Sequence, residues 1–242
     1  MRKISNMDEK IPDKRFIKLY NFGIRVLSSC IVLSSLRRKF RNKHLIDPAF
    51  IDNYIYIIDN EGNKKRIFQN MKNVKLRFTG KNNIVELPNS HFCALFNIQE
   101  DNSYIKIGKN FSANDVTFRL IEGNSTVIIG DDCMFSCNID ILSSDGHVIM
   151  RKGEVRPYNQ PKPVIIGNHV WVGYNVKILK GTEIADNTIL GACSVVSGKF
   201  NEPNVIIAGN PARVVKQDID WNSLPHVMYN ATLEKMLVGA CN

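Results

Sequence analysis

The chain lacks the paired cysteines that build zinc sites and disulfide frameworks. Its 242 residues include six cysteines, none in a CxxC pair, and no histidine lies near Cys133 or Cys137 in the sequence. Structural zinc sites need four such ligands at short spacings. We therefore expect no bound metal, and we expect reduced thiols in a cytosolic protein. The cysteines are Cys30, Cys93, Cys133, Cys137, Cys193 and Cys241.

The chain also lacks an apolar run long enough to cross a membrane. The uncharged stretch 26–36 is short, and a spanning helix needs about 20 apolar residues. The first residues are polar, which argues against a signal peptide. These features predict a cytoplasmic protein, with any membrane contact limited to the inner face.

Positive charge is in excess in one segment only. Residues 1–43 hold twelve Lys or Arg against three Asp or Glu, and the rest of the chain holds twenty against twenty. Apolar residues recur at helical spacing through 14–43, and basic residues close the segment. One interpretation is a helix on an anionic membrane surface, and the other is a helix packed on the protein or in an oligomer. No recognition motif follows, so we expect no nucleic acid partner.

A period of six organises the segment from Ile166 to Ser197. One aliphatic residue recurs at each sixth position, and small or β-branched residues recur four positions later. Neither a helix nor a single strand has this period, whereas a parallel β-helix does. Three units of six would close one coil, which stacks Ile184 on Ile166. The aliphatic positions are Ile166, Val172, Ile178, Ile184, Leu190 and Val196.

The preceding chain continues the repeat less regularly. Val85, Ile107 and Ile129 are 22 residues apart, which predicts coils with a short insertion. Residues 54–67 resemble a strand, a turn and a second strand, and could cap the open end of the coils. We expect three parts: a basic helix and capping hairpin (1–70), a β-helix (71–200), and a C-terminal segment with a tail (201–242).

A long insertion interrupts the repeat at residues 148–163. It is basic, and prolines stiffen its exit. A loop of this length in a tight solenoid is usually functional or disordered. Its basic residues could meet an acidic substrate, and a solvated loop explains them equally well.

Three blocks of sequence resemble a known family. They are SDGH at 144–147, VIIGNHVWVGYNVKILKG at 164–181 and VIIAGNPARVVK at 205–216. They resemble the hexapeptide-repeat acyltransferases, above all the bacterial O-acetyltransferases of capsule, O-antigen and sialic-acid polysaccharides. The resemblance implies a mainly all-β, left-handed parallel β-helix. It further implies acetyl-CoA as co-substrate and a homotrimer with active sites between neighbouring chains.

Three residues are candidates for the chemistry. An acetyl thioester is already activated, so transfer to a hydroxyl needs a positioned base, and imidazole suits neutral pH. His147 is the candidate base, although a histidine in a surface turn would look the same. Asp145 could orient His147 or could cap the turn. Trp171 precedes an inward residue and should point outward, toward thioester and sugar or toward a subunit contact. His169 lies in a turn, and we interpret it either as structural or as a residue that supports one of the catalytic side chains.

The resemblance also implies the coenzyme contacts. It places Tyr174, Ala192 and Ser197 along the pantetheine arm, and Lys199, Arg213 and Lys216 toward the phosphates, with Lys180 as a further candidate. Solvated charge is the alternative for Lys199 and Lys216.

These features together predict an O-acetyltransferase that acts on a bacterial surface polysaccharide with a histidine base. The alternatives are a sugar N-acyltransferase, a small-sugar O-acetyltransferase, a zinc-dependent carbonic anhydrase on the same scaffold, and a non-catalytic solenoid. The anhydrase would need three zinc histidines, and His91, His147 and His169 lack a clustered spacing.

Overall fold

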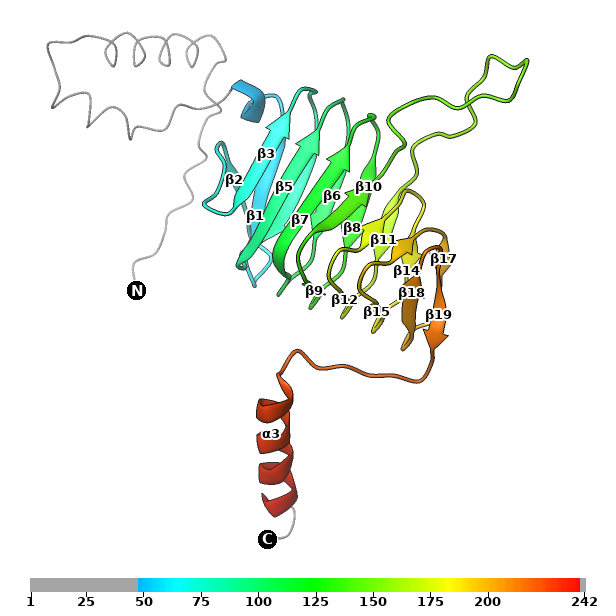
Figure 1. Ribbon diagram of the computed structural model, residues 1–242. Helices are drawn as coiled ribbons and strands as arrows, with labels where there is room; N and C mark the ends of the chain where they lie inside the picture. The colour runs from blue at the N-terminus through cyan, green and yellow to red at the C-terminus, as the bar shows by residue number, and fades with distance from the viewer. Residues whose placement is uncertain (1–47, 240–242) are drawn as a thin grey trace, which may run out of the picture.

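Short parallel strands wind around a common axis into a prism (Figure 1). The computed structural model describes residues 48–239. A 3-10 helix, η1 (Pro48–Phe50), precedes the first strand. The strands form an eight-stranded sheet and an eleven-stranded sheet, and the second sheet bends at its long strand β7 (Ser112–Leu120). The first residues of β7 pair with β9, and its later residues pair with β10, so the two sheets supply three faces.

The first face is the eight-stranded sheet. Its parallel members are β1 (Tyr54–Ile58), β4 (Ile84–Pro88), β6 (Tyr104–Ile107), β8 (Thr126–Ile129), β11 (Val164–Ile166), β14 (Glu183–Ile184) and β17 (Lys199–Phe200). The antiparallel strand β2 (Lys64–Ile67) closes one end as a hairpin with β1.

The eleven-stranded sheet supplies the other two faces. The second face contains β9 (Met134–Phe135), β12 (Trp171–Val172), β15 (Ile189–Leu190) and β18 (Ile206–Gly209), with β19 (Ala212–Lys216) antiparallel at its end. The third contains β3 (Val74–Phe78), β5 (Phe92–Ile98), β10 (Ile139–Leu142), β13 (Lys177–Ile178) and β16 (Val195–Val196), alongside β7.

The six-residue repeat fills the prism, as the sequence predicts. Ile166 lies opposite Ile184, Val172 opposite Leu190, and Ile178 opposite Val196. All six aliphatic positions are at most 4% exposed, and the small residues four positions on are fully buried. Stacked coils therefore bury one aliphatic side chain per strand, and the apolar area removed from water stabilises the prism.

The register of the early coils differs from the prediction at one step. Ile107 lies opposite Ile129 as expected, but Val85 lies opposite Ile105, not Ile107. Ile105 and Ile107 are both buried, because side chains alternate along a strand. Because both residues point inward, the sequence spacing alone does not determine which of them pairs with Val85. The wider early coils are filled by aromatic rings, including the stacked pair Phe96 and Phe118, whose centroids are 4.4 Å apart.

Two segments leave the prism. The loop between β10 and β11 projects from one corner, and the tail after β19 leads to α3 (His226–Gly239), which stands clear of the strands (Figure 1). No helix within residues 48–239 combines the length and apolarity needed to cross a membrane. The predicted helix at 14–43 lies outside the described residues. The division of the chain at residues 70 and 200 stays a prediction, although β1 and β18 pair in parallel with strands between those limits.

Candidate functional site

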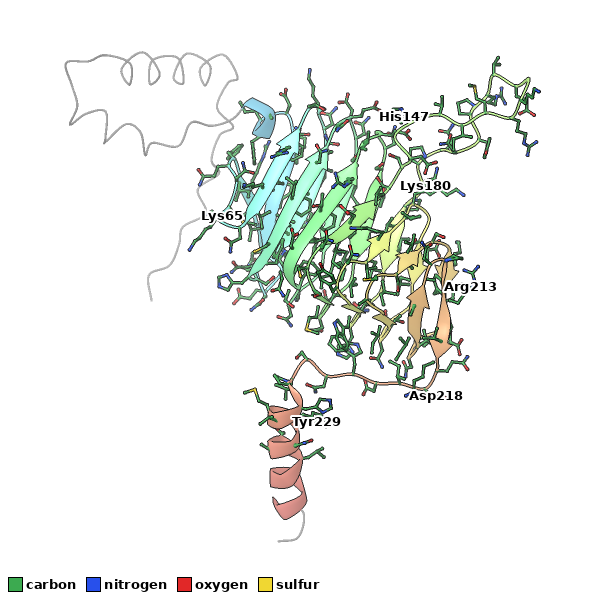
Figure 2. The ribbon with its side chains drawn as sticks, in the orientation of Figure 1. Lys65, His147, Lys180, Arg213, Asp218 and Tyr229 are labelled. Carbon is green, nitrogen blue, oxygen red and sulfur yellow. The ribbon has the colours of Figure 1, made fainter. Side chains whose placement is uncertain are left out.

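His147 lies where the chain passes from the third face to the first. It follows β10 at the root of the projecting loop, and Lys180 lies close by after β13 (Figure 2). Backbone hydrogen bonds close the root: Lys162 N–H donates to the Ser143 carbonyl at 3.1 Å, and Gly181 N–H donates to the Pro163 carbonyl at 3.0 Å. The solenoid therefore holds both ends of the loop.

The side chain of Asn159 fixes the backbone around His147. Its amide N–H donates to the His147 carbonyl at 2.8 Å and to the Asp145 carboxylate at 2.7 Å. Its amide oxygen accepts from Ile149 N–H at 2.7 Å. One side chain thus ties the two limbs of the loop on either side of the imidazole.

Lys180 braces the same structure. Its Nζ lies 2.6 Å from Asp145 Oδ2 and donates to the carbonyls of Asn159 at 2.6 Å and Gln160 at 3.3 Å. An ammonium has three donors, and all three are engaged. The hydrogen bond from Lys180, followed by that from Asn159, holds the pKa of Asp145 below its ordinary value.

These contacts bear on two expectations for the site. The sequence leaves Asp145 either to orient His147 or to cap the turn, and its carboxylate contacts Lys180 and Asn159. The sequence also offers Lys180 to the coenzyme, and its ammonium is engaged within the loop. The arrangement favours a bracing role for both residues, with His147 held through its backbone.

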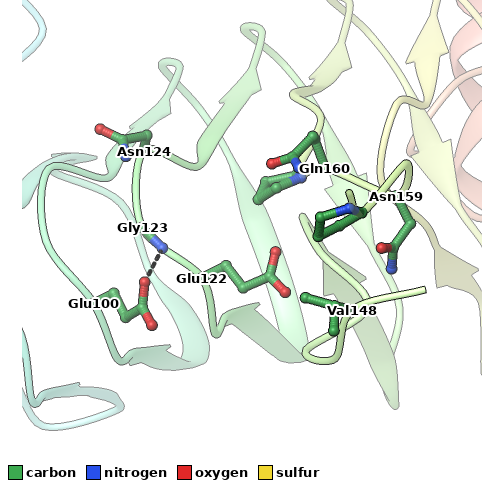
Figure 3. Close-up of a pocket in the computed structure, with 9 residues that line it drawn as sticks. Glu100, Glu122, Gly123, Asn124, Val148, Asn159 and Gln160 are labelled. Atoms are coloured by element: carbon green, nitrogen blue, oxygen red, sulfur yellow. Dashed lines mark hydrogen bonds between the residues drawn. The ribbon is translucent and has the colours of Figure 1, made fainter. Parts of the chain in front are cut away.

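The imidazole of His147 is exposed and accepts or donates no hydrogen bond within residues 48–239. A pocket of about 510 Å³ lies at the root of the loop, and its lining includes the next residue along the chain (Figure 3). Val148 lines this pocket together with Glu100 and Glu122 from the preceding turns of the same corner. Glu100 accepts a hydrogen bond from Gly123 N–H at 3.0 Å, and the Glu122 carboxylate extends into the pocket. Carboxylates at this position can accept hydrogen bonds from hydroxyl groups of a ligand.

Trp171 lies on a different face of the same chain. It belongs to β12 on the second face, and its side chain is 37% exposed, as alternation predicts. Its indole lies 5.9 Å from that of Trp221, at an interplanar angle of 41°. Trp221 in turn stacks on His169, with centroids 4.1 Å apart and planes within 8°. His147 and Trp171 are therefore not neighbours on one sheet, and a single chain presents them separately.

The predicted coenzyme residues occupy several places. Tyr174 and Ala192 lie in successive turns between the second and third faces, whereas Ser197 lies in the turn after β16. Lys199 lies in β17, and its Nζ is 2.6 Å from Glu183 Oε1. Arg213 and Lys216 lie in β19 and are exposed. Neither forms an ion pair with any residue in the described part of the chain, so both cations are available to phosphate groups.

Metal-ligand residues do not gather in the described structure. No group of three or more His, Cys, Asp or Glu side chains between residues 48 and 239 is arranged to hold an ion. Cys133 lies in the core, and burial raises the pKa of its thiol to about 12.

Two residues of the site carry little signal in the sequence. Asn159 contacts Asp145 and His147 only because the loop folds back on itself, and Trp221 reaches His169 across a separation of 52 residues. An asparagine in a loop and a tryptophan in a tail are otherwise unremarkable. The one available signal is that Trp221 is one of only two tryptophans in the chain.

Comparison with known proteins places these features in context. Residues 163–198 match the family model described as bacterial transferase hexapeptide (six repeats). The chain is 42% identical over 120 residues to galactoside O-acetyltransferase of Escherichia coli (strain K12), covering 48% of this chain and 55% of the relative. It is 43% identical over 107 residues to polysialic acid O-acetyltransferase of Neisseria meningitidis, covering 44% of this chain and 48% of the relative. The chain thus spans about half the length of the curated relatives it matches.

A solved structure supports the fold. The crystal structure of the polySia specific acetyltransferase NeuO is similar with a TM-score of 0.52 at 24% identity, covering 75% of this chain and 94% of that chain. The predicted left-handed parallel β-helix is confirmed. The predicted resemblance is confirmed as well: this chain carries the hexapeptide repeat of bacterial transferases and is similar to the hexapeptide-repeat O-acetyltransferases.

Proposed function

We propose that this protein is an O-acetyltransferase that moves an acetyl group from acetyl-CoA to a hydroxyl of a bacterial surface polysaccharide. The observation that carries the proposal is the placement of His147. Its imidazole is exposed, and its chain neighbour Val148 lines a pocket with hydrogen-bonding walls. Asn159 and the braced loop hold its backbone. The relatives support the class of reaction, since those reported above are named for O-acetyl transfer.

His147 acts as a general base in this proposal. Its imidazole takes the proton of the acceptor hydroxyl while the hydroxyl oxygen attacks the thioester carbonyl carbon. The carbon–sulfur bond then breaks, and the imidazolium returns the proton to the departing thiolate. Proton and electron pair balance without a covalent enzyme intermediate. A positioned base of this kind contributes about 10² to 10⁴ in rate.

The active site is shared between copies of the chain. His147 lies at the corner between the third and first faces, and Trp171 lies on the second face. A site that uses both residues needs a neighbouring chain to supply one of them, which a homotrimer of prisms would do. The pocket at the root of the loop, which we assign to the acceptor, then belongs to one chain. The indole of Trp171 belongs to the next chain.

The residues available to the coenzyme fit its two parts. Tyr174 and Ala192 lie one coil apart on the same corner, which gives a straight edge for the narrow pantetheine arm. Arg213 and Lys216 offer cations to the phosphates. The proposed coenzyme groove runs from this edge past the turn after β16, where Ser197 lies, to Lys199 in β17. Lys180 would have to leave Asp145 in order to contact a phosphate.

The basic segment at 14–43 has its own proposed partner. Its excess of positive charge suits contact with the anionic inner face of a membrane, where a surface polysaccharide or its precursor would be found.

One experiment tests the proposed activity and identifies the acceptor. The protein is incubated with acetyl-CoA carrying a ¹³C-labelled acetyl group and with separate acceptors: a galactoside, α2,8-linked polysialic acid, and neutral capsule and O-antigen polysaccharides. We expect one acceptor to gain label, and NMR then locates the ester by the downfield shift of the acylated carbinol proton. If none of the acceptors changes the rate at which coenzyme A is released, the proposal is contradicted.

A further inference from the structure

Both tryptophans of the chain line one pocket on the second face. The pocket has a volume of about 530 Å³, within the range of about 300 to 1,000 Å³ that small-molecule sites have. It lies between β12 and β15 on one side and the tail and the start of α3 on the other. Its walls are Trp171, Ile189, Asp220, Trp221, Asn222, Leu224, Pro225, His226 and Tyr229.

Trp221 is held rigidly before any ligand arrives. His169 stacks on one face of its indole at 4.1 Å, and its Nε1–H donates to the His169 carbonyl at 2.9 Å. The adjacent Asp220 Oδ1 accepts from the backbone N–H of Trp221 at 2.8 Å. A ring held by stacking and by its own N–H, on a backbone that is itself hydrogen-bonded, loses little conformational entropy when a ligand stacks on its remaining face.

Trp171 provides the second ring of the pocket. The two indoles are tilted at 41°, so they form an angled platform instead of packing flat against each other. Trp171 is 37% exposed, and its indole N–H has no acceptor among residues 48–239. An aromatic face with a free N–H donor suits a ligand that has both an apolar face and hydroxyl groups, as a pyranose ring does.

The charge of the pocket selects among ligands of this kind. None of its nine lining residues is a lysine or an arginine, and Asp220 contributes a carboxylate. Phosphate groups and the carboxylates of sialic acids would find no lysine or arginine there, and Asp220 would repel them, so His226 is the one lining residue that could offer them a positive charge. The polar groups that remain, including the amide of Asn222, suit neutral hydroxyls.

We propose that this pocket binds a neutral hexopyranose unit of a saccharide, stacked on Trp171 and Trp221. The proposal rests on the proposed function, because it names the acceptor class as a neutral or mostly neutral glycan. Within one chain the pocket lies away from the corner that carries His147, and in the proposed oligomer its Trp171 lies next to the His147 of a neighbouring chain. The pocket therefore holds a sugar unit beside the one that presents its hydroxyl to that base. Trp221 is in this view a specificity residue.

Tryptophan fluorescence reports directly on ligand binding in this pocket, because the chain contains two tryptophans and both line the pocket. The full-length protein is titrated with cellohexaose, whose all-equatorial glucose rings present apolar faces, and separately with α2,8-linked hexasialic acid. We expect a saturable change in emission with cellohexaose, and an at least ten-fold weaker response with hexasialic acid. An equal or stronger response to hexasialic acid would overturn the proposal, as would a flat titration with cellohexaose.

Variants assign the response to the two rings. Trp221→Ala should raise the dissociation constant for cellohexaose about ten-fold or more, whereas Trp221→Phe keeps a ring and should change it less than about three-fold. Calorimetric titration supplies the readout that does not depend on tryptophan. Tyr158→Ala, which removes an exposed aromatic ring from the projecting loop, is the control and should bind normally. Unchanged binding by a folded Trp221→Ala protein would overturn the assignment.

The two proposals fail separately. Acetyl transfer to a saccharide without binding in this pocket would leave the enzyme proposal standing and remove the subsite. Binding of cellohexaose without acetyl transfer to any acceptor would leave a saccharide-binding pocket on a protein of another function.

Discussion

The amide of Asn159 donates a hydrogen bond of 2.8 Å to the backbone carbonyl of His147. The same amide donates to Asp145, and its oxygen accepts from Ile149 N–H, so one side chain sets the path of the chain on both sides of the imidazole. The candidate base is therefore positioned through its backbone, and its ring remains open to the solvent and to a ligand.

Removal of this side chain should impair turnover more than coenzyme binding. In Asn159→Ala, His147 loses its backbone anchor, and a displacement of about 1 Å can cost about ten-fold or more in rate. We expect kcat to fall by that amount and KM for acetyl-CoA to stay within about two-fold. Val155→Ala, at a fully solvated position of the same loop, is the control and should behave as wild type. Equal kcat in the two variants would remove the positioning role.

Substitution of Lys180 tests whether this residue braces the loop or contacts a phosphate of the coenzyme. As a brace, it holds Asp145 and two loop carbonyls, and Lys180→Met should lower kcat and reduce the free energy of unfolding by about 1 to 3 kcal/mol. The KM for acetyl-CoA should hardly change. Lys199→Met, which removes a cation from the proposed coenzyme groove, should instead raise that KM. Steady-state kinetics and urea denaturation of the two variants provide the comparison. A raised KM in Lys180→Met with normal stability would assign Lys180 to the coenzyme.

Acid should release the loop through Asp145. The pKa of this carboxyl lies below its ordinary value of 3.8, chiefly because Lys180 and then Asn159 donate hydrogen bonds to its ionised form. A lowered pKa contributes stability that is fully present above the ordinary value and is lost as pH falls through the folded value. The free energy of unfolding of wild type should therefore exceed that of Asp145→Asn by a constant amount above about pH 5, and the difference should shrink below about pH 4. A difference that stays constant down to pH 3 would contradict this reading.

Mixed oligomers test whether two chains share each site. His147→Ala and Trp171→Ala homo-oligomers should both be impaired, because each lacks one half of every site. Unfolding and refolding the two variants together at equal concentration should restore activity to about a quarter of wild type, since about one site in four then pairs an intact His147 with an intact Trp171. Refolding each variant alone provides the baseline. No recovery in the mixture, with native mass spectrometry showing mixed oligomers, would place the two residues in separate functions.

The sequence alone predicts the repetitive part of this fold because the repeat is local. Ile166, Ile184 and their equivalents recur at one spacing, and each position has the same buried environment. The pairing of Val85 with Ile105 is harder to predict from the sequence. Ile105 and Ile107 point to the same face of the strand, so either of them satisfies the pattern.

The candidate site is predictable only for the residues inside the motif blocks. His147 precedes the long loop, and Trp171 lies within the repeat, so pattern and resemblance both identify these two residues. Asn159 and Trp221 act through contacts that form when distant segments meet, such as the hydrogen bond from Trp221 to the His169 carbonyl. Lys180 illustrates the same difficulty, because its partner Asp145 lies 35 residues away and across the loop.

The central claim is that the imidazole of His147 is the base for acetyl transfer. The most direct measurement is the single-turnover rate of transfer from labelled acetyl-CoA to the identified acceptor, comparing wild type with His147→Ala at neutral pH. We predict a fall of about 10²-fold or more with unchanged oligomeric state and unchanged coenzyme binding. A folded His147→Ala protein that transfers acetyl groups at the wild-type rate would contradict the account.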